Sequence, residues 1–412
     1  MAPSPSDPGL QSGRIFYGWY VAYALCLVAT TTAGLAFYNI SVLLDAFVSE
    51  RGFPVAVASL ASGLFFVGSG TGGVLAGHLI DRFDARLVVI VSASVGALAL
   101  GCIGLLREPW QLHAFYLLFG FTFGGCGLVP ISTIVARWFN VRRPQALAIA
   151  STGLSLGGVV LTPLSALAIK QLGLAGAAPW LGLVFFLGVV PATALVVRPR
   201  PQAMGLEPDG VARRSDSVAA TLPGIPFSQA WRTRYYVAVT GAYVFALGAQ
   251  VGGIAHIYRL ASTRADDQVA ALAVALFAAV SLAGRLASGW LMMSVPLRVF
   301  ALALMAVQAI GLALLAHAAS GPGILAATAF FGATSGTILM MQQLLLADAF
   351  GTREYGRIYS VSMLLTVIGV AAGPALVGLI STSAGYGSAY LAIAVASLVG
   401  CAVMALGGTP RR

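Results

Sequence analysis

Long apolar runs recur along the whole chain and decide what it can fold into. A transmembrane helix needs about 20 consecutive apolar residues to cross a hydrocarbon core of about 30 Å. Runs of this length exclude membrane β-strands, which need about ten alternating residues each. Twelve runs are predicted to be transmembrane helices: 17–44, 55–79, 87–106, 112–136, 145–169, 179–197, 235–258, 268–293, 297–318, 322–347, 357–380 and 387–406.

The composition agrees with a chain that is surrounded by membrane lipids. Hydrophobic residues make up 59% and charged residues 9% of the 412 residues, whereas a soluble domain carries about 25% charged residues. We therefore expect an all-α integral membrane protein.

The net charge of +10 follows the loops and does not gather on one face. Basic residues concentrate in alternate loops, such as those around Arg82, Arg142 and Arg198, which the positive-inside rule places in the cytoplasm. This distribution predicts cytoplasmic N- and C-termini, and we expect a bacterial cytoplasmic (inner) membrane. It offers no basic surface for nucleic acid.

The chain is predicted to divide into two bundles of six helices. A proline-containing polar stretch, 198–234, separates an N-terminal bundle at 17–197 from a C-terminal bundle at 235–406. Cytoplasmic tails are expected at 1–16 and 407–412.

Internal similarity relates the two halves. Phe139 precedes Pro163 by 24 residues in the first half, and Phe350 precedes Pro374 by 24 residues in the second. Parallel repeats of this kind are typical of one transporter architecture, in which the substrate site lies between the halves.

Glycines recur at four-residue spacing within the predicted helices. The pairs Gly73 with Gly77 and Gly120 with Gly124 would let helix backbones approach closely. We interpret them as packing surfaces.

Arg285 is the only charged residue placed deep within a predicted helix. An arginine at membrane depth costs roughly 3 kcal/mol on insertion scales. Helical spacing puts Ala278, Ser281, Ser288 and Met292 on the same face, which therefore faces the bundle interior. All acidic residues fall in loops or near helix ends, so Arg285 has no obvious counter-ion. It either pairs with a substrate carboxylate through its planar fork or bonds backbone carbonyls as a structural residue.

The loop between the second and third predicted helices carries a charged motif. Gly77, Asp81, Arg82 and Arg86 resemble the signature loop of the major facilitator superfamily, which has a glycine where Asp84 stands here. The charges either mark topology alone or form a cytoplasmic latch that breaks as access changes. The resemblance implies twelve transmembrane helices in two pseudo-symmetric six-helix bundles.

Three further stretches, 17–21, 137–148 and 284–289, resemble the monocarboxylate transporters and the related oxalate:formate antiporters. In that family, the arginine matched by Arg285 binds substrate carboxylate. Some members carry a proton-coupling aspartate one turn earlier, where this chain has Ser281. The antiporters use a second cation, a lysine of helix 11, which this chain lacks. The resemblance therefore implies one carboxylate held by one cation.

His256, near the end of the predicted helix 235–258, is the second titratable candidate. It is either a proton acceptor, because an imidazole titrates near neutral pH, or an interfacial histidine bonded to backbone or water. Neutral polar residues either complete the binding site or serve only interhelical hydrogen bonds; the candidates are Tyr38, Asn39, Thr122, Cys126, Gln250, Ser281 and Gln342.

The sequence as a whole predicts a secondary transporter. We expect it to move a small organic monocarboxylate by alternating access, as a functional monomer, with proton coupling left open. The alternatives are an anion antiporter of the oxalate:formate type, an exporter of hydrophobic or drug-like compounds, and a membrane sensor with a transporter fold. No enzymatic constellation, metal site or cofactor is predicted, because the cysteines are scattered and no Ser/His/Asp set is present.

Overall fold

The computed structural model describes residues 16–139, 142–198, 200–210, 224–292, 294–351 and 354–408, and its regular structure there is helical apart from one bridge between Gly224 and Gly351. The predicted all-α fold is thus confirmed. The first lobe contains α1 (Tyr17–Thr32), η1 (Ala33–Phe37), α2 (Asn39–Ser49), α3 (Val55–Arg82), α4 (Ala85–Gly101), η2 (Ile103–Leu105), α5 (Pro109–Cys126), α6 (Leu128–Trp138), α7 (Arg143–Leu156), η3 (Gly157–Leu161) and α8 (Thr162–Leu195). The connection carries η4 (Pro201–Met204), η5 (Pro208–Gly210) and α9 (Phe227–Ala230). The second lobe contains α10 (Arg234–Arg264), α11 (Asp267–Leu291), α12 (Leu297–His317), α13 (Gly321–Phe350) and α14 (Tyr355–Leu406).

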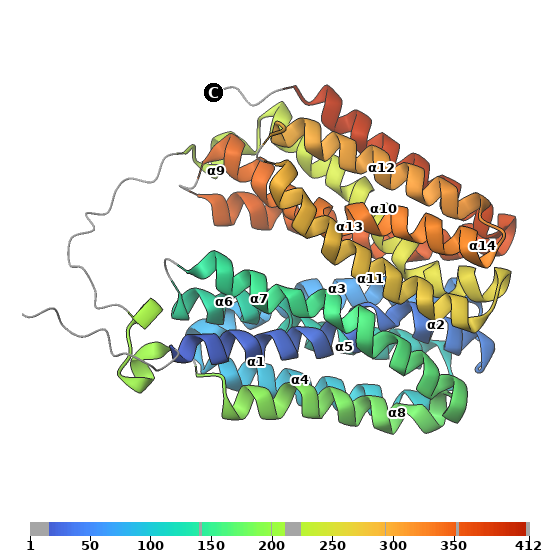
Figure 1. Ribbon diagram of the computed structural model, residues 1–412, viewed down its shortest axis with the longest axis horizontal. Helices are drawn as coiled ribbons and strands as arrows, with labels where there is room; N and C mark the ends of the chain where they lie inside the picture. Colours follow the sequence, from blue (N-terminus) through green and yellow to red (C-terminus); the bar gives the residue numbers. More distant parts are fainter. Residues whose placement is uncertain are drawn as a thin grey trace, which may run out of the picture.

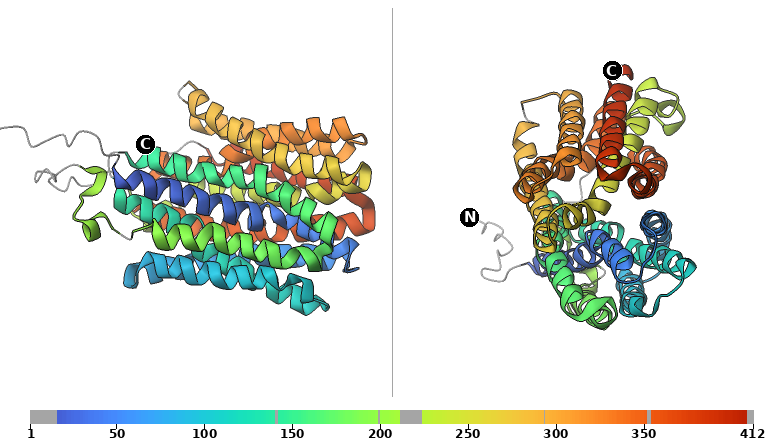
Figure 2. Two further views of the ribbon diagram at one scale, coloured as in Figure 1. Left: turned by 60° about the horizontal axis from the view of Figure 1, so that its bottom comes forward. Right: turned by 90° about the vertical axis from the view of Figure 1, so that its right-hand side faces the viewer.

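The helices form two side-by-side lobes (Figure 1). An end-on view separates the α1–α8 group from the α10–α14 group, each built of roughly parallel and antiparallel helices (Figure 2). The polar connection predicted at 198–234 lies between these two groups in the sequence, and its residues 211–223 fall outside the described part.

Ten segments of the described chain are long and apolar enough to cross a membrane. Two of them, Gln145–Leu195 and Arg357–Leu406, contain 51 and 50 residues; a straight helix of that length would measure about 75 Å, more than twice the hydrocarbon thickness. Each contains a glycine with a non-helical backbone, Gly173 (φ 69°, ψ 166°) and Gly385 (φ 77°, ψ 167°). We therefore interpret each as two spans joined by a turn (Figure 1). The total of twelve transmembrane helices remains a prediction.

The two lobes repeat the same internal contacts. Phe65 of α3 lies against Phe119 of α5, with ring centroids 6.0 Å apart, and Phe277 of α11 lies against Phe331 of α13, with centroids 5.0 Å apart. Both residues of the second pair follow their counterparts by 212 positions, which is also the separation of the two glycine turns. The internal similarity of the sequence therefore corresponds to a repeat in packing.

Close helix packing in the first lobe uses one of the two glycine pairs singled out in the sequence. Gly120 and Gly124 of α5 lie directly against the backbone of α3 at Phe65 and Ser69, where no side chain would fit. Gly73 of α3, by contrast, has only ordinary contact distances around it.

α1 begins and α14 ends at the same end of the molecule (Figure 1). The lobes diverge toward that end and approach each other at the opposite end, which we call the outer end. The cytoplasmic location of the termini remains a prediction from the charge distribution.

Candidate functional site

Arg285 lies half-buried on α11, on the side that packs against α13. Its Nε donates a hydrogen bond to the Gly336 carbonyl of α13 at 3.2 Å. Within the described ranges, no acidic residue forms an ion pair with it and its two terminal nitrogens have no hydrogen-bond partner. These two nitrogens remain available for a two-point contact with a carboxylate.

Tyr38 reaches the same region from the first lobe. Its ring is buried and lies against Phe277 of α11, with centroids 6.3 Å apart. Tyr38 and Arg285 also lie close enough to interact electrostatically. The region around Arg285 therefore lies between the lobes, with a guanidinium from one and a phenol from the other.

Two π-helical turns position Tyr38. η1, which ends just before Tyr38, packs on η3 at Gly34 and Gly157, where the two backbones are in direct contact. The Thr162 hydroxyl donates to the Gly34 carbonyl at 2.9 Å, and Gly158 lies against the Tyr38 ring. π-helical turns are frequent at functional sites, because the extra residue redirects the side chains that follow.

Ser281 and Gln250 meet Arg285 at one segment of α13. Ser281 packs on Gly336, whose carbonyl accepts from Arg285. Gln250 of α10 donates its amide N–H to the carbonyl of Ser335, the residue before Gly336, at 3.2 Å. The side-chain carbonyl oxygen of Gln250 is buried without a partner. The structure thus brings Arg285, Ser281, Gln250 and Tyr38 into one region.

Asn39 is fully buried at the start of α2, and neither its amide nitrogen nor its carbonyl oxygen has a hydrogen-bond partner. An unpaired buried polar group costs about 1–3 kcal/mol, so buried polar groups normally bind protein, water or ligand. Asn39 follows Tyr38 directly in the chain, but its side chain makes no hydrogen bond to the residues around Arg285.

Three other predicted site residues have contacts elsewhere. Thr122 donates to the Phe119 carbonyl of its own helix and packs on Gly96 of α4, and Cys126 bonds the Thr122 carbonyl. These contacts place both residues on the α4 side of α5. Gln342 of α13 donates instead to two hydroxyls of α14, those of Ser362 (3.0 Å) and Thr366 (3.1 Å).

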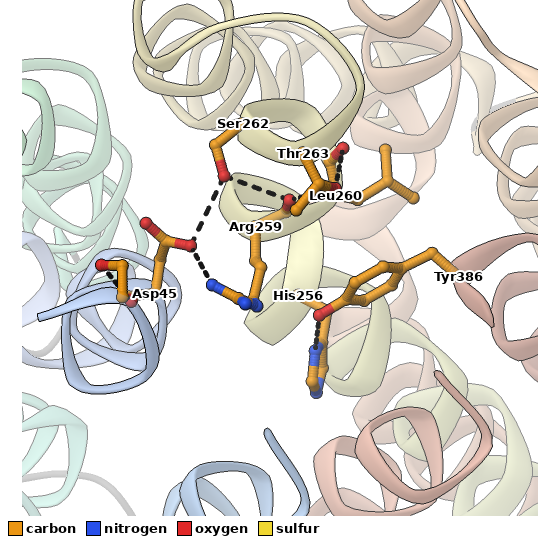
Figure 3. Close-up of polar contacts among 8 residues, drawn as sticks. Asp45, His256, Arg259, Leu260, Ser262, Thr263 and Tyr386 are labelled. Atoms are coloured by element: carbon orange, nitrogen blue, oxygen red, sulfur yellow. Dashed lines mark hydrogen bonds and ion pairs between the residues drawn. The ribbon is translucent and has the colours of Figure 1, made fainter. Parts of the chain in front are cut away.

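His256 is fully buried in α10. Its Nε2 lies 3.0 Å from the Pro374 carbonyl. Its Nδ1 lies 3.3 Å from the Tyr386 hydroxyl (Figure 3). A carbonyl can only accept, so Nε2 carries the proton and Nδ1 accepts from the tyrosine. Both ring nitrogens of a neutral imidazole are thereby satisfied, which favours the structural interpretation of His256.

The sequence analysis missed an ion pair between the lobes. Asp45 and Arg259 directly follow the predicted helices 17–44 and 235–258. In the structure α2 runs to Ser49 and α10 to Arg264, so both residues belong to candidate membrane-spanning segments. Arg259 Nη1 donates to Asp45 Oδ1 at 2.6 Å, and the two side chains are 18% and 15% exposed (Figure 3). Asp45 thus lies about one turn from the end of its helix, as expected, and the correction to the sequence analysis concerns Arg259, which lies within α10. The spacing along the helix could have indicated this position, because Asp45 follows Tyr38 by seven residues, or two turns, and therefore lies on the same face.

Asp84, the departure from the signature loop, caps α4. Its Oδ1 accepts from the Arg86 amide at 2.9 Å, and its Oδ2 accepts from Arg86 Nε and Nη2 at 3.0 and 2.8 Å. Partial burial raises the pKa of the Asp84 carboxyl, but the hydrogen bonds from Arg86 and the charges of Arg86 and Arg137 outweigh burial and leave the pKa below its ordinary value. Arg86 is thereby tied to the start of its own helix.

The rest of the signature loop surrounds the end of α3. Gly77 lies within α3, Arg82 is exposed, and the side chain of Asp81 falls outside the described part. Arg137 of α6 donates to the Ile80 carbonyl of α3 at 3.1 Å. This bond joins two helices of one lobe, and a latch that breaks during transport remains a prediction.

Family comparison agrees with the two-lobed fold and the signature loop. The family model described as Major Facilitator Superfamily matches residues 26–365 and 239–412. The chain belongs to the major facilitator superfamily. The resemblance noted at the Gly77–Arg86 loop is thus confirmed at the level of the superfamily.

Relatives of this facilitator include fungal and animal transporters. The MFS transporter asaE of Aspergillus flavus is 25% identical over 82% of this chain and 72% of its own length. Monocarboxylate transporter 9 of Rattus norvegicus is 30% identical over 39% of this chain, and the match spans only 31% of that relative.

Two solved structures share the fold. A bacterial homolog of the human lysosomal transporter Spinster, in an inward-facing and occupied conformation, has a TM-score of 0.71 at 16% identity and covers 96% of this chain and 97% of its own. The nucleoside transporter NupG has a TM-score of 0.68 at 14% identity, covering 94% and 99%. At these identities the likeness concerns the fold alone.

Proposed function

We propose that this facilitator moves a small organic monocarboxylate across the membrane by alternating access of its two lobes to the site at Arg285. The observation that carries the proposal is the guanidinium itself. It lies within a membrane-spanning helix, its terminal nitrogens have no partner in the described part of the chain, and no acid there neutralises it. A substrate anion would supply the missing charge and both hydrogen bonds.

Arg264 provides the contrast that supports this interpretation. It ends α10, and its guanidinium donates to the carbonyls of Leu315 (2.8 Å), Ala318 (2.7 Å) and Ala316 (3.1 Å) at the end of α12. A structural arginine in this protein thus uses its terminal nitrogens on backbone carbonyls. Arg285 uses only its Nε on a backbone carbonyl, and its two terminal nitrogens have no partner in the described part of the chain.

The surroundings of Tyr38 favour a substrate with an apolar part. A series of ring contacts runs from Phe66 through Phe37 and Tyr38 to Phe277 and Phe331 across the interface between the lobes. Aromatic faces bind apolar and aromatic groups well. This series also supports the second candidate function, export of hydrophobic compounds, which would need no carboxylate on the cargo.

The coupling, setting and assembly are part of the same proposal. The chain would act as a monomer in a cytoplasmic membrane with cytoplasmic termini, as the distribution of its basic residues suggests. Co-transport of a proton with the anion is the proposed coupling, and exchange of the oxalate:formate type is the alternative. Exchange would be supported if uptake required a carboxylate inside the vesicle and its rate did not depend on a pH gradient across the membrane.

The deciding experiment measures uptake by purified protein in proteoliposomes. Lactate, pyruvate and benzoate should be transported, whereas benzamide, the neutral counterpart of benzoate, should not. A dicarboxylate would bring an uncompensated charge into the site, so oxalate should bind at least about tenfold more weakly, equivalent to about 1.4 kcal/mol.

Two variants of Arg285 and one control complete this test. Arg285→Gln and Arg285→Lys should both abolish uptake, because neither supplies a planar fork, while Arg264→Gln should lower thermal stability and keep uptake. Full uptake by Arg285→Lys would refute a two-point carboxylate contact, and transport of benzamide as well as benzoate would favour the exporter.

A further inference from the structure

Arg259 and Ser262 of α10 already hold a carboxylate in this structure, namely that of Asp45. Arg259 Nη1 donates to Asp45 Oδ1 at 2.6 Å (Figure 3). The Ser262 hydroxyl lies 3.4 Å from the same oxygen and 3.1 Å from the Arg259 carbonyl, the nearer acceptor for its single proton. The carboxylate comes from α2 of the first lobe, and the guanidinium and the neighbouring hydroxyl come from α10 of the second. The contact is therefore a carboxylate site that the protein fills with its own side chain.

Asp45 uses this site incompletely. Only its Oδ1 is engaged by side-chain donors in the described part of the chain, and Arg259 Nε is buried without a hydrogen-bond partner. An arginine pairs best with a carboxylate through two parallel N–H donors. A free carboxylate, which is not anchored to α2, could align with both Nε and a terminal nitrogen of Arg259.

The Asp45–Arg259 contact repeats the arrangement at Arg285, nearer the outer end. Tyr38 directly precedes α2, and Asp45 follows it by seven residues, two helical turns or about 10 Å along the axis. Asp45 binds Arg259 directly, and Tyr38 lies within electrostatic range of Arg285, so at both levels an oxygen group of the first lobe lies toward a guanidinium of the second. On α10, Arg259 lies nine residues, about 14 Å, beyond Gln250.

Charged and titratable groups around Asp45 come from several helices. Tyr258 of α10 and Tyr386 of α14 lie within electrostatic range of its carboxylate, as does Asp267 at the start of α11. Asp267 itself pairs with Lys170 of α8 at 3.2 Å, a second link between the lobes at this end, with side chains 47% and 60% exposed. Arg259 is the cation bonded directly to Asp45.

We propose that Arg259 and Ser262 form an outer carboxylate-binding site, which Asp45 occupies while the outer end is closed and which the substrate's carboxylate takes when the lobes part there. The inference rests on the proposed function and adds a second binding position to it. Opening the outer end separates α2 from α10 and leaves a partly buried guanidinium without its counter-ion, which is costly. An arriving anion removes that cost, so it favours opening and is then about two helical turns from the Arg285 level.

The test measures how far the two lobes separate at the outer end, with formate, the smallest carboxylate, as the ligand. Spin labels are attached to Arg107→Cys and Ala319→Cys, which are exposed positions at the outer ends of the two lobes, in the full chain with its four native cysteines replaced by alanine. The chain also carries Arg285→Gln, so that the proposed central site contributes nothing. Pulsed electron paramagnetic resonance then measures the distance between the labels in nanodiscs with formate, with neutral formamide, or with chloride at equal ionic strength.

Formate should raise the ratio of molecules with a separated outer end to molecules with a closed one by at least about threefold, equivalent to about 0.65 kcal/mol. Formamide and chloride should not change this ratio. Arg259→Gln should abolish the response and Arg259→Lys should weaken it, because lysine keeps the charge and loses the fork. Asp45→Asn should lower the half-saturating formate concentration, since the competing carboxylate is gone. Lys170→Gln, which breaks the other link between the lobes, should leave the formate response intact.

Three outcomes would overturn the proposal: no response to formate, a full response in Arg259→Gln, or an equal loss in Lys170→Gln. Each is independent of the proposed function, whose failure would appear as absence of monocarboxylate uptake by the wild-type protein.

Discussion

Replacing Gly157 by alanine should destabilise this facilitator through the contact between its two π-helical turns. A methyl group at this position would lie 2.2 Å from the Thr30 carbonyl oxygen and 2.5 Å from the Gly34 nitrogen, whereas ordinary contacts begin at 3.4 Å. The turns would have to separate by about 1 Å, and overpacking of this kind costs about 1–3 kcal/mol. Alanine returns about 0.5–1 kcal/mol through its better helix propensity, so the expected net loss is up to about 2.5 kcal/mol.

The matched control is Gly241→Ala on α10, where the nearest atom would be Val403 Cγ1 at 3.6 Å. This variant should be neutral or slightly stabilised. Thermal unfolding in one detergent compares the two proteins, and proteoliposome uptake shows whether the displaced turns also disturb Tyr38. Equal stability of Gly157→Ala and Gly241→Ala would refute the claim that the π-helical turns are in tight contact.

Two further predictions concern titratable residues. Asp84→Asn should lower stability near neutral pH by about 0.5 kcal/mol, as for a modest ion pair with Arg86. The pKa of Asp84 is depressed in the folded protein, so its contribution is present above the unfolded pKa and is lost as pH falls through the folded pKa; unfolding curves of the two proteins should converge in acid, and a constant difference would contradict the ion pair. His256→Gln should lower stability by about 1–3 kcal/mol, because the Pro374 and Tyr386 groups lose a partner, and should leave the pH dependence of net uptake unchanged. A pH profile flattened between about pH 5 and 8 would instead make His256 the proton carrier.

The contrast between Arg285 and Arg259 explains what the sequence could reveal. Arg285 interrupts a long apolar run, so its cost is visible in the sequence alone. Arg259 lies where hydropathy falls and the predicted helix ended at 258. α10 continues because tertiary partners stabilise its last turns: Arg259 binds Asp45, and Arg264 binds the carbonyls at the end of α12. Helix ends fixed by other helices cannot be read from a local pattern.

The neutral site residues illustrate a second limit. Tyr38, Ser281 and Gln250 lie near Arg285, whereas Thr122 faces α4 and Gln342 binds α14. All five are small or polar residues within apolar helices, and a uniformly apolar helix carries little information about which side faces a neighbour. The repeat of the two halves was more informative, because Phe139 and Pro163 are related to Phe350 and Pro374 by an offset of 211 residues, and the ring contacts and the glycine turns by an offset of 212.

The turns at Gly173 and Gly385 have a consequence for how this protein is made and engineered. At each turn one glycine with a positive φ reverses the chain. Just after the first turn, the Leu174 amide donates to the carboxylate of Glu50, the residue that follows α2, at 2.7 Å. Two helices joined so tightly must enter the bilayer together, as one hairpin. Epitope tags, protease sites and circular-permutation breaks placed at these positions should therefore fail, and the loops at Gly52 and Ala319 are the better places for them.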